Sequence, residues 1–154
     1  MGGDVVARLY RLHPDSSSLV SPRAFARVFC DQGTLPQTVR FYEAVAGTTL
    51  DMDMDIPESG LHVVAVGPFL ILEMDQSLDR AAQASQTHVT LLNAHLDEAV
   101  NRAVAKGAVV VQERWESPPG PGVRLRHPDG LLVEYLEHRP SPDDVGRPGP
   151  ALGM

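Results

Sequence analysis

The feature that most constrains the fold of this chain is an internal repeat. A shift of 61 residues places Leu35 on Leu96 and residues 70–73 on 131–134 without a gap. The apolar side chains alternate in some segments and recur every three to four residues in others, so each half is predicted to run strand, helix, strand, strand, strand. Such a duplication predicts two copies of one structural unit. We therefore expect two βαβββ modules whose curved half-sheets enclose a cavity.

The repeat also sets the predicted domain boundaries. We expect an N-terminal arm over residues 1–22, a first module over 23–76, a linker over 77–87, a second module over 88–138 and a disordered tail over 139–154. The tail is rich in Pro, Gly and Asp, which does not favour a packed core. In the first module, Asp51, Asp53 and Asp55 alternate with apolar residues. This pattern predicts a half-exposed strand with a solvated acidic face rather than a calcium loop.

Composition excludes several classes of partner. The net charge of −7 over 154 residues opposes binding to the phosphates of nucleic acids and to anionic membrane surfaces. No apolar run approaches the length of a membrane span, and the N-terminus lacks the pattern of a secretory signal. Cys30 is the only cysteine, which excludes an internal disulfide and a multi-cysteine zinc site. We expect a cytoplasmic protein that binds neither nucleic acid nor membrane.

Glu134 lies in the predicted last strand of the second module. Asp129-Gly130 predicts a tight turn, and the strand that follows places Leu132, Glu134 and Leu136 on one face. A carboxylate on such a face is costly to bury unless it is paired, hydrogen-bonded or bound to a metal. Glu134 is therefore expected to have a specific partner in the fold.

Three segments occur in order along the chain and carry a family resemblance. They are Arg40-Phe41-Tyr42-Glu43, the segment from Val66 to Glu73, and His127-Pro128-Asp129-Gly130 continuing to Glu134-Tyr135. In this order and at these spacings, roughly residues 24–138 resemble the vicinal oxygen chelate superfamily, which includes glyoxalase I, bleomycin-resistance proteins and extradiol dioxygenases. The resemblance implies an α+β fold in which two βαβββ modules form a curved mixed sheet around a cup. It also implies a homodimer, because family members often complete the cup by dimerising.

The same resemblance implies a set of site residues. In metal-dependent members, the ligands come from the first and last strands of each module, and these positions fall on Arg27, Glu73, His88 and Glu134. The residues of each pair, Arg27 with Glu73 and His88 with Glu134, are 46 positions apart. His88, Glu73 and Glu134 could hold one divalent ion, and zinc, nickel, iron or manganese would suit a histidine with two carboxylates. An open coordination position would then take the oxygens of a substrate.

Arg27 opposes a metal centre. A guanidinium stays protonated and does not ligate metals, but it forms charge-assisted pairs with carboxylates such as Glu73 or Glu134. The interpretation we favour is a cup without a metal, in which Arg27, Glu73, His88 and Glu134 form a buried polar network. The alternative, a cup with one divalent metal, stays open at this point.

Two further side chains are candidate ligand contacts. His62 lies on an apolar strand of the first module, where it either lines the cavity or faces solvent. Trp115 is the only tryptophan and is predicted to lie in a loop. It either rims the cavity, where an aromatic ring can stack on a flat ligand, or anchors the loop on the sheet.

Three functions fit these residues. The first is an enzyme of lyase, isomerase or oxygenase type for a small organic substrate, with Glu134 or Glu73 as the base and His88 as metal ligand or acid. The second is a metal-free protein that sequesters an antibiotic or another aromatic or amphipathic compound. The third is a metal-free enzyme in which Arg27 binds a substrate carboxylate or oxyanion while a carboxylate–histidine pair moves a proton. We favour an enzyme; the sequence names no substrate.

Overall fold

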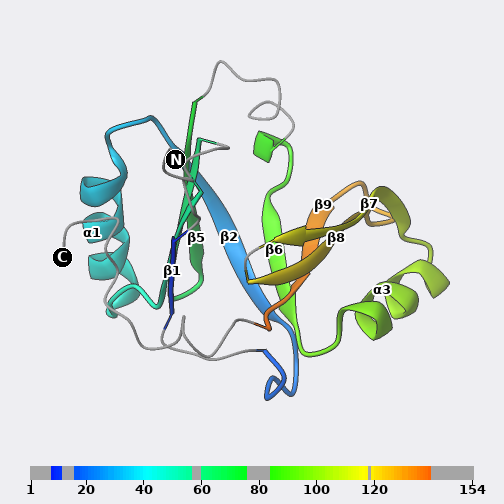
Figure 1. Ribbon diagram of the computed structural model, residues 1–154. Helices are drawn as coiled ribbons and strands as arrows, with labels where there is room; N and C mark the ends of the chain where they lie inside the picture. The colour runs from blue at the N-terminus through cyan, green and yellow to red at the C-terminus, as the bar shows by residue number, and fades with distance from the viewer. Residues whose placement is uncertain (1–7, 12–15, 57–59, 76–83, 118, 140–154) are drawn as a thin grey trace, which may run out of the picture.

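The computed structural model describes residues 8–11, 16–56, 60–75, 84–117 and 119–139 (Figure 1). The described residues form two βαβββ modules preceded by one short strand, β1 (Arg8–Arg11). The first module contains β2 (Arg23–Cys30), α1 (Leu35–Ala46), β3 (Met52–Ile56), β4 (Leu61–Val66) and β5 (Phe69–Met74). The second contains β6 (Val89–Asn93), α3 (Leu96–Ala105), β7 (Val109–Ser117), β8 (Gly120–Arg126) and β9 (Leu132–Glu137).

The strands of the described residues form one mixed nine-stranded sheet in the order β1-β3-β4-β5-β2-β6-β9-β8-β7. In each module the first strand pairs in parallel with the last, β2 with β5 and β6 with β9. Antiparallel pairing of β2 with β6 joins the two modules at the centre of the sheet. Figure 1 shows α1 and α3 on the outer sides of the two half-sheets, far from each other. The predicted α+β fold of two modules that share a curved mixed sheet is confirmed.

The hydrophobic core has three parts, and their positions explain why a cavity forms. On the outer face of the first module, α1 buries Leu35 and Val39 against β4 and β5. On the outer face of the second module, α3 buries Leu96 and Ala99 against β8 and β9. The third part lies on the inner face and draws on both modules: Phe25, Met52, Met54, Val63, Ala65, Leu70, Leu72 and Leu92. Helices therefore cover the outer faces, whereas the inner faces of the two half-sheets face a shared space.

A glutamate near the end of each module holds the start of its helix. Glu73 Oε2 accepts hydrogen bonds from the backbone N–H groups of Gly33 and Leu35, at 2.9 and 3.1 Å. Glu137 Oε1 accepts one from the N–H of Leu96 at 2.7 Å. The first N–H groups of a helix lack partners within the helix, so a carboxylate there satisfies them and complements the helix dipole.

Two local features differ from what the sequence favours. Thr34 precedes α1 and is a residue type that often caps a helix start, but its hydroxyl donates to the carbonyl of Asp31, so that Glu73 makes the capping contacts instead. The segment around Trp115, which was predicted to be a loop, is mostly strand, because β7 continues to Ser117 and β8 begins at Gly120. Trp115 therefore lies in a strand.

Half of the predicted arm and most of the predicted linker and tail lie outside the described residues. The described part of the arm includes β1, which pairs antiparallel with β3 at one edge of the sheet. The linker is described only from Ala84 onward, and the tail only at Arg139. In the described part of the chain, no helix has the length and apolar character needed to cross a membrane.

Candidate functional site

The inner face of the sheet encloses a cavity of about 270 Å³, which we call the cup. Both modules contribute to its wall. The apolar lining includes Phe25, Met52, Met54, Ile56, Leu61, Val63, Leu70, Leu72, Met74, Trp115 and Leu136, and the polar lining includes Arg27, Thr90, Gln112, Ser117, Arg124, Glu134 and His138. A concave, mostly apolar space with a few convergent polar groups is the usual form of a small-molecule site.

The polar groups of the cup meet where β2, β6 and β9 adjoin. Arg27 Nη1 lies 3.3 Å from Glu134 Oε1, and the hydroxyl of Thr90 donates to the same oxygen at 3.0 Å. Arg27 Nη1 also donates to the Thr90 hydroxyl at 3.2 Å. Both contacts to Glu134 use Oε1, so its second oxygen, Oε2, has no hydrogen-bond partner among the described residues. One oxygen fixes the carboxylate, and the other has no contact with a described residue.

The guanidinium of Arg27 is deeply buried. Its side chain is 5% exposed, and its Nε is a buried donor without a hydrogen-bond partner in the part of the chain that the structure describes. Burial lowers the pKa of Arg27, Glu134 opposes this effect, and the positive charge of Arg124 adds to it. Arg27 is thus a buried cation with one close carboxylate and a spare donor.

Arg124 is a cup residue that the sequence analysis missed. It is 8% exposed, and its Nη1 donates to the hydroxyl of Thr87 at 3.1 Å. It pairs with Glu134 across the β8–β9 ladder, so both side chains point to the same face. The signal was present in the sequence, because the tight turn at Asp129-Gly130 fixes the register of this hairpin.

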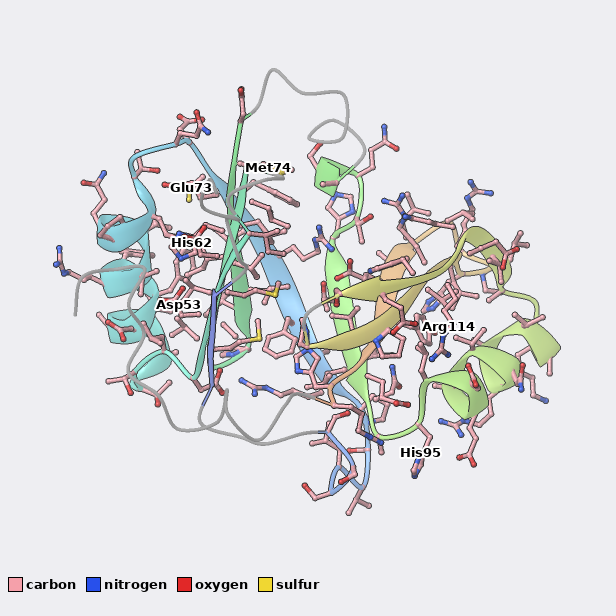
Figure 2. All side chains as sticks on the ribbon, viewed as in Figure 1. Asp53, His62, Glu73, Met74, His95 and Arg114 are labelled. Atoms are coloured by element: carbon pink, nitrogen blue, oxygen red, sulfur yellow. The ribbon has the colours of Figure 1, made fainter. Side chains whose placement is uncertain are left out.

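Glu73 does not face the cup. In the second module, Thr90 pairs with Glu134. In the first, Phe29, which the repeat matches to Thr90, pairs with Leu72 rather than with Glu73. A shift of one residue reverses the face to which a strand side chain points. Glu73 therefore lies on the α1 side of the sheet (Figure 2), and the predicted network that joined it to Glu134 is wrong.

His88 also lies apart from the polar centre of the cup, which is formed by Arg27, Thr90 and Glu134. It immediately precedes β6, its side chain is exposed, and its backbone carbonyl accepts a hydrogen bond from the N–H of Arg27. Among the described residues, no three His, Cys, Asp or Glu side chains come close enough to hold a metal ion. The ligand set expected from His88, Glu73 and Glu134 is therefore not brought together, and a guanidinium, which cannot ligate a cation, occupies the centre of the site.

His62 lies on the opposite face of the sheet from the cup. Its Nε2 is 2.7 Å from Oδ1 of Asp53, whose side chain is completely buried (Figure 2). The solvated face predicted for Asp53 is therefore wrong. Asp53 pairs across the strands with Val64, which packs in the α1 core, and His62 supplies the polar contact that such burial requires.

Trp115 lines the cup and is also anchored on the sheet. It pairs with Gly122 on β8, and a Cβ atom added to Gly122 would lie 2.5 Å from Cζ2 of the Trp115 ring. The absence of a side chain at Gly122 lets the indole pack directly on the backbone. The two alternatives for Trp115 therefore coexist in the structure, and its contact with a ligand stays a prediction.

Two βαβββ modules that curl one sheet around a cup define the vicinal oxygen chelate class of proteins. Within that class, this chain belongs to the glyoxalase-like domain family, whose family model matches residues 27–134. No curated protein sequence matches the chain.

Solved structures of other proteins share the fold. An uncharacterized protein from Methanosarcina mazei is 25% identical, with a TM-score of 0.62 over 75% of this chain and 91% of that one. Methylmalonyl-CoA epimerase from Mycobacterium tuberculosis is 18% identical, with a TM-score of 0.53 over 81% and 93% of the two chains. A variant of Streptomyces coelicolor methylmalonyl-CoA epimerase in complex with 2-nitronate-propionyl-CoA is 18% identical, with a TM-score of 0.50 over 75% and 97%. The fold therefore includes enzymes that act on small molecules.

Proposed function

We propose that this protein is an enzyme that moves a proton on a small organic molecule held in the cup, with Glu134 as the base. The observation that carries the proposal is the way in which Glu134 is held. Thr90 and Arg27 both contact Oε1, which orients the carboxylate and leaves Oε2 without a described partner. A general base needs this combination of fixed orientation and an oxygen within reach of the substrate.

Arg27 supplies the second part of the chemistry. When Glu134 takes a proton from a carbon next to a carbonyl group, the bonding electrons of that C–H bond move toward the carbonyl oxygen. A fixed cationic donor stabilises the resulting oxyanion strongly where water is excluded. Arg27 is such a donor, because it is buried and its Nε has no described partner. Return of the proton to a different carbon atom of the substrate would complete an isomerisation, and departure of a leaving group from the neighbouring carbon would complete a lyase reaction.

The proposal assigns the stabilising charge to a guanidinium rather than to a metal ion. The reason is the donor set, since the described residues bring a single carboxylate, Glu134, to the cup and place Glu73 and His88 elsewhere. Any ion in the cup would also lie close to the charge of Arg27. The steps written above therefore use side chains of this chain alone.

A second candidate function is sequestration of a ligand without turnover. It is favoured by the apolar part of the wall, where Met52, Met54 and Met74 come together with Trp115. Methionine side chains are flexible and polarisable, and they are common on surfaces that accept ligands of varied shape. Catalysis requires the Glu134 carboxylate as a base, whereas sequestration does not. One experiment can therefore separate the two functions.

The experiment is proton exchange in D₂O, followed by proton NMR with a panel of small ketones, esters and 2-oxo acids. The wild type is expected to incorporate deuterium next to the carbonyl of at least one compound, also after treatment with a chelator. Glu134→Gln should slow this exchange about 100-fold or more, since general bases contribute about that much or more. Glu116→Gln is the matched control, because Glu116 is an exposed carboxylate on β7.

Two results would contradict the proposal. Exchange that persists at the wild-type rate in Glu134→Gln would show that another group is the base. Tight binding of a panel compound with no exchange in the wild type would favour sequestration.

A further inference from the structure

The charge of Arg27 is already balanced inside the cup. Its Nη1 lies 3.3 Å from Oε1 of Glu134, and its Cζ lies 5.5 Å from the centre of the Phe29 ring. A carboxylate and the face of an aromatic ring both stabilise a buried cation. Arg124, the other arginine of the lining, has interaction partners of its own, Thr87 among them. A ligand of the cup therefore does not have to bring a counter-ion for Arg27.

The contact between Arg27 and Glu134 leaves donors on one side chain and an acceptor on the other. Arg27 makes its described side-chain hydrogen bond and ion pair through Nη1, so Nη2 and Nε contact no polar group of the described residues. Glu134 is contacted through Oε1, so its Oε2 has no such contact either. An uncharged polar group with an acceptor beside a donor complements both side chains at once.

Charged ligands match this pair less well. A carboxylate only accepts hydrogen bonds, so it would place a second negative charge beside Glu134 without a donor for Oε2. An ammonium group only donates, so it would offer no acceptor to Arg27 and would lie beside its positive charge. The net charge of −7 on the whole chain also acts against the approach of anions.

The rest of the wall is suited to an apolar body of limited size. Phe25, Met52 and Met54 line the side contributed by the first module, and Trp115 lines the cup from the second. The cavity of about 270 Å³ lies just below the usual range of about 300–1,000 Å³ for drug-sized ligands. A compact molecule with a short aliphatic or aromatic body fits these dimensions, whereas a polymer does not.

We infer that the ligand of the cup is an uncharged carbonyl compound with a compact apolar body. Its carbonyl oxygen accepts a hydrogen bond from Arg27, and a hydrogen on the atom next to the carbonyl faces Oε2 of Glu134. This inference rests on the proposed function and adds the class of substrate. In a ketone or an ester that hydrogen is bound to carbon and is the proton to be moved. In a primary amide it is bound to nitrogen, so an amide is a probe of the same binding geometry.

The test compares an acid, a methyl ketone and a primary amide of nearly the same shape by isothermal titration calorimetry at neutral pH. One set is 3-phenylpropanoate, 4-phenylbutan-2-one and 3-phenylpropanamide, and the other is 4-methylpentanoate, 5-methylhexan-2-one and 4-methylpentanamide. In at least one set we expect the amide to bind most tightly and the acid least tightly. The amide should bind about tenfold or more tightly than the acid, because a hydrogen bond to a charged group contributes about that much.

Glu134→Gln tests the part of this order that depends on the carboxylate. The variant removes the negative charge that opposes the acid, so the preference for the amide over the acid should fall to about twofold or less. Glu116→Gln is the matched control and should keep the wild-type order, because Glu116 is an exposed carboxylate on β7. The comparison within the wild type needs no variant and therefore does not depend on how well one folds.

Three results would overturn the inference. The first is that no amide or ketone of the two sets binds at millimolar concentration. The second is that each acid binds at least as tightly as its amide in the wild type. The third is a preference for the amide that is unchanged in Glu134→Gln.

The two proposals fail in different ways. Proton exchange that persists in Glu134→Gln, together with the expected order of amide, ketone and acid, would overturn the proposed base and leave the ligand class standing. Loss of exchange in Glu134→Gln, together with acids that bind as tightly as their amides, would do the reverse.

Discussion

The two modules share one order of elements but differ in what they bring to the cup. The second module contributes Thr90, Arg124 and Glu134, whereas the first contributes Arg27 and an otherwise apolar wall. The glutamate at the end of the first module, Glu73, binds the start of α1 on the other face of the sheet. The same residue type thus caps a helix in one copy and lines the cup in the other. A repeat in the sequence therefore predicts a repeat in architecture but not in chemistry.

The difference between the modules requires that the part of the cup wall contributed by the second module stays packed. The variant Gly122→Ala tests this packing. A Cβ atom there would lie 2.5 Å from the Trp115 ring and 2.7 Å from the side chain of Leu136. We expect the free energy of unfolding to fall by about 2 kcal/mol or more, the size of effect seen when a packed core is overfilled. Urea denaturation measures it.

The matched variant in the first module is Gly47→Ala. Gly47 has a φ of +69° but open space around its Cβ position, so the loss should be nearer about 1 kcal/mol, from backbone strain alone. Equal losses in the two variants would show that the Trp115 contact does not stabilise the second module.

The two helix-capping glutamates offer a comparison in which the modules should behave alike. Glu73→Ala and Glu137→Ala each remove an acceptor for N–H groups at a helix start. Each should lower the free energy of unfolding by about 1 kcal/mol, as loss of a helix cap does. The measurement is urea denaturation, with hydrogen exchange of α1 and α3 amides to locate the change. If Glu73→Ala instead slowed proton exchange in the cup without a loss of stability, the assignment of Glu73 to the helix face would be wrong.

The smallest expected effect comes from the outer face of β9. Burial raises the pKa of Tyr135, and the charge of Arg102 partly offsets this. Because the pKa is higher in the folded state, the stability it contributes is full below about pH 10, the unfolded value, and declines as the pH rises toward the raised folded value. Tyr135→Phe should therefore flatten the loss of stability above about pH 10. Urea denaturation across that range tests this, and an unchanged slope would contradict it.

The fold was predictable because its determinants are local. Apolar periodicity located both helices, and α1 ends at Ala46, immediately before Gly47, the residue type that most often ends a helix. The association of Arg27 with Glu134 was one of the two pairings that the charge argument allowed. Arg124 could have been found in the same way, because the turn at Asp129-Gly130 already placed it opposite Glu134.

The face of the sheet on which the Glu73 side chain lies could not be predicted from the ungapped repeat. Strand register is set by pairing between segments far apart in the chain, and an error of one residue reverses every side chain of the strand. The first strands match with a shift of 61 residues, Phe29 on Thr90, whereas their partners in the last strands, Leu72 and Glu134, are 62 residues apart. The second copy is therefore one residue longer before its last strand, and an overlay without gaps does not reveal this.

The pairing of β2 with β6, which joins the two modules, has a thermodynamic consequence. Arg27 belongs to the first module and Glu134 to the second, so the polar centre exists only while both modules are folded against each other. A ligand that binds only this assembled state stabilises it by mass action, in proportion to the logarithm of its concentration. Neither half can then unfold without releasing the ligand. Occupancy of the cup would therefore couple the melting of the two halves into one cooperative transition, although most of the cup's charge comes from one of them.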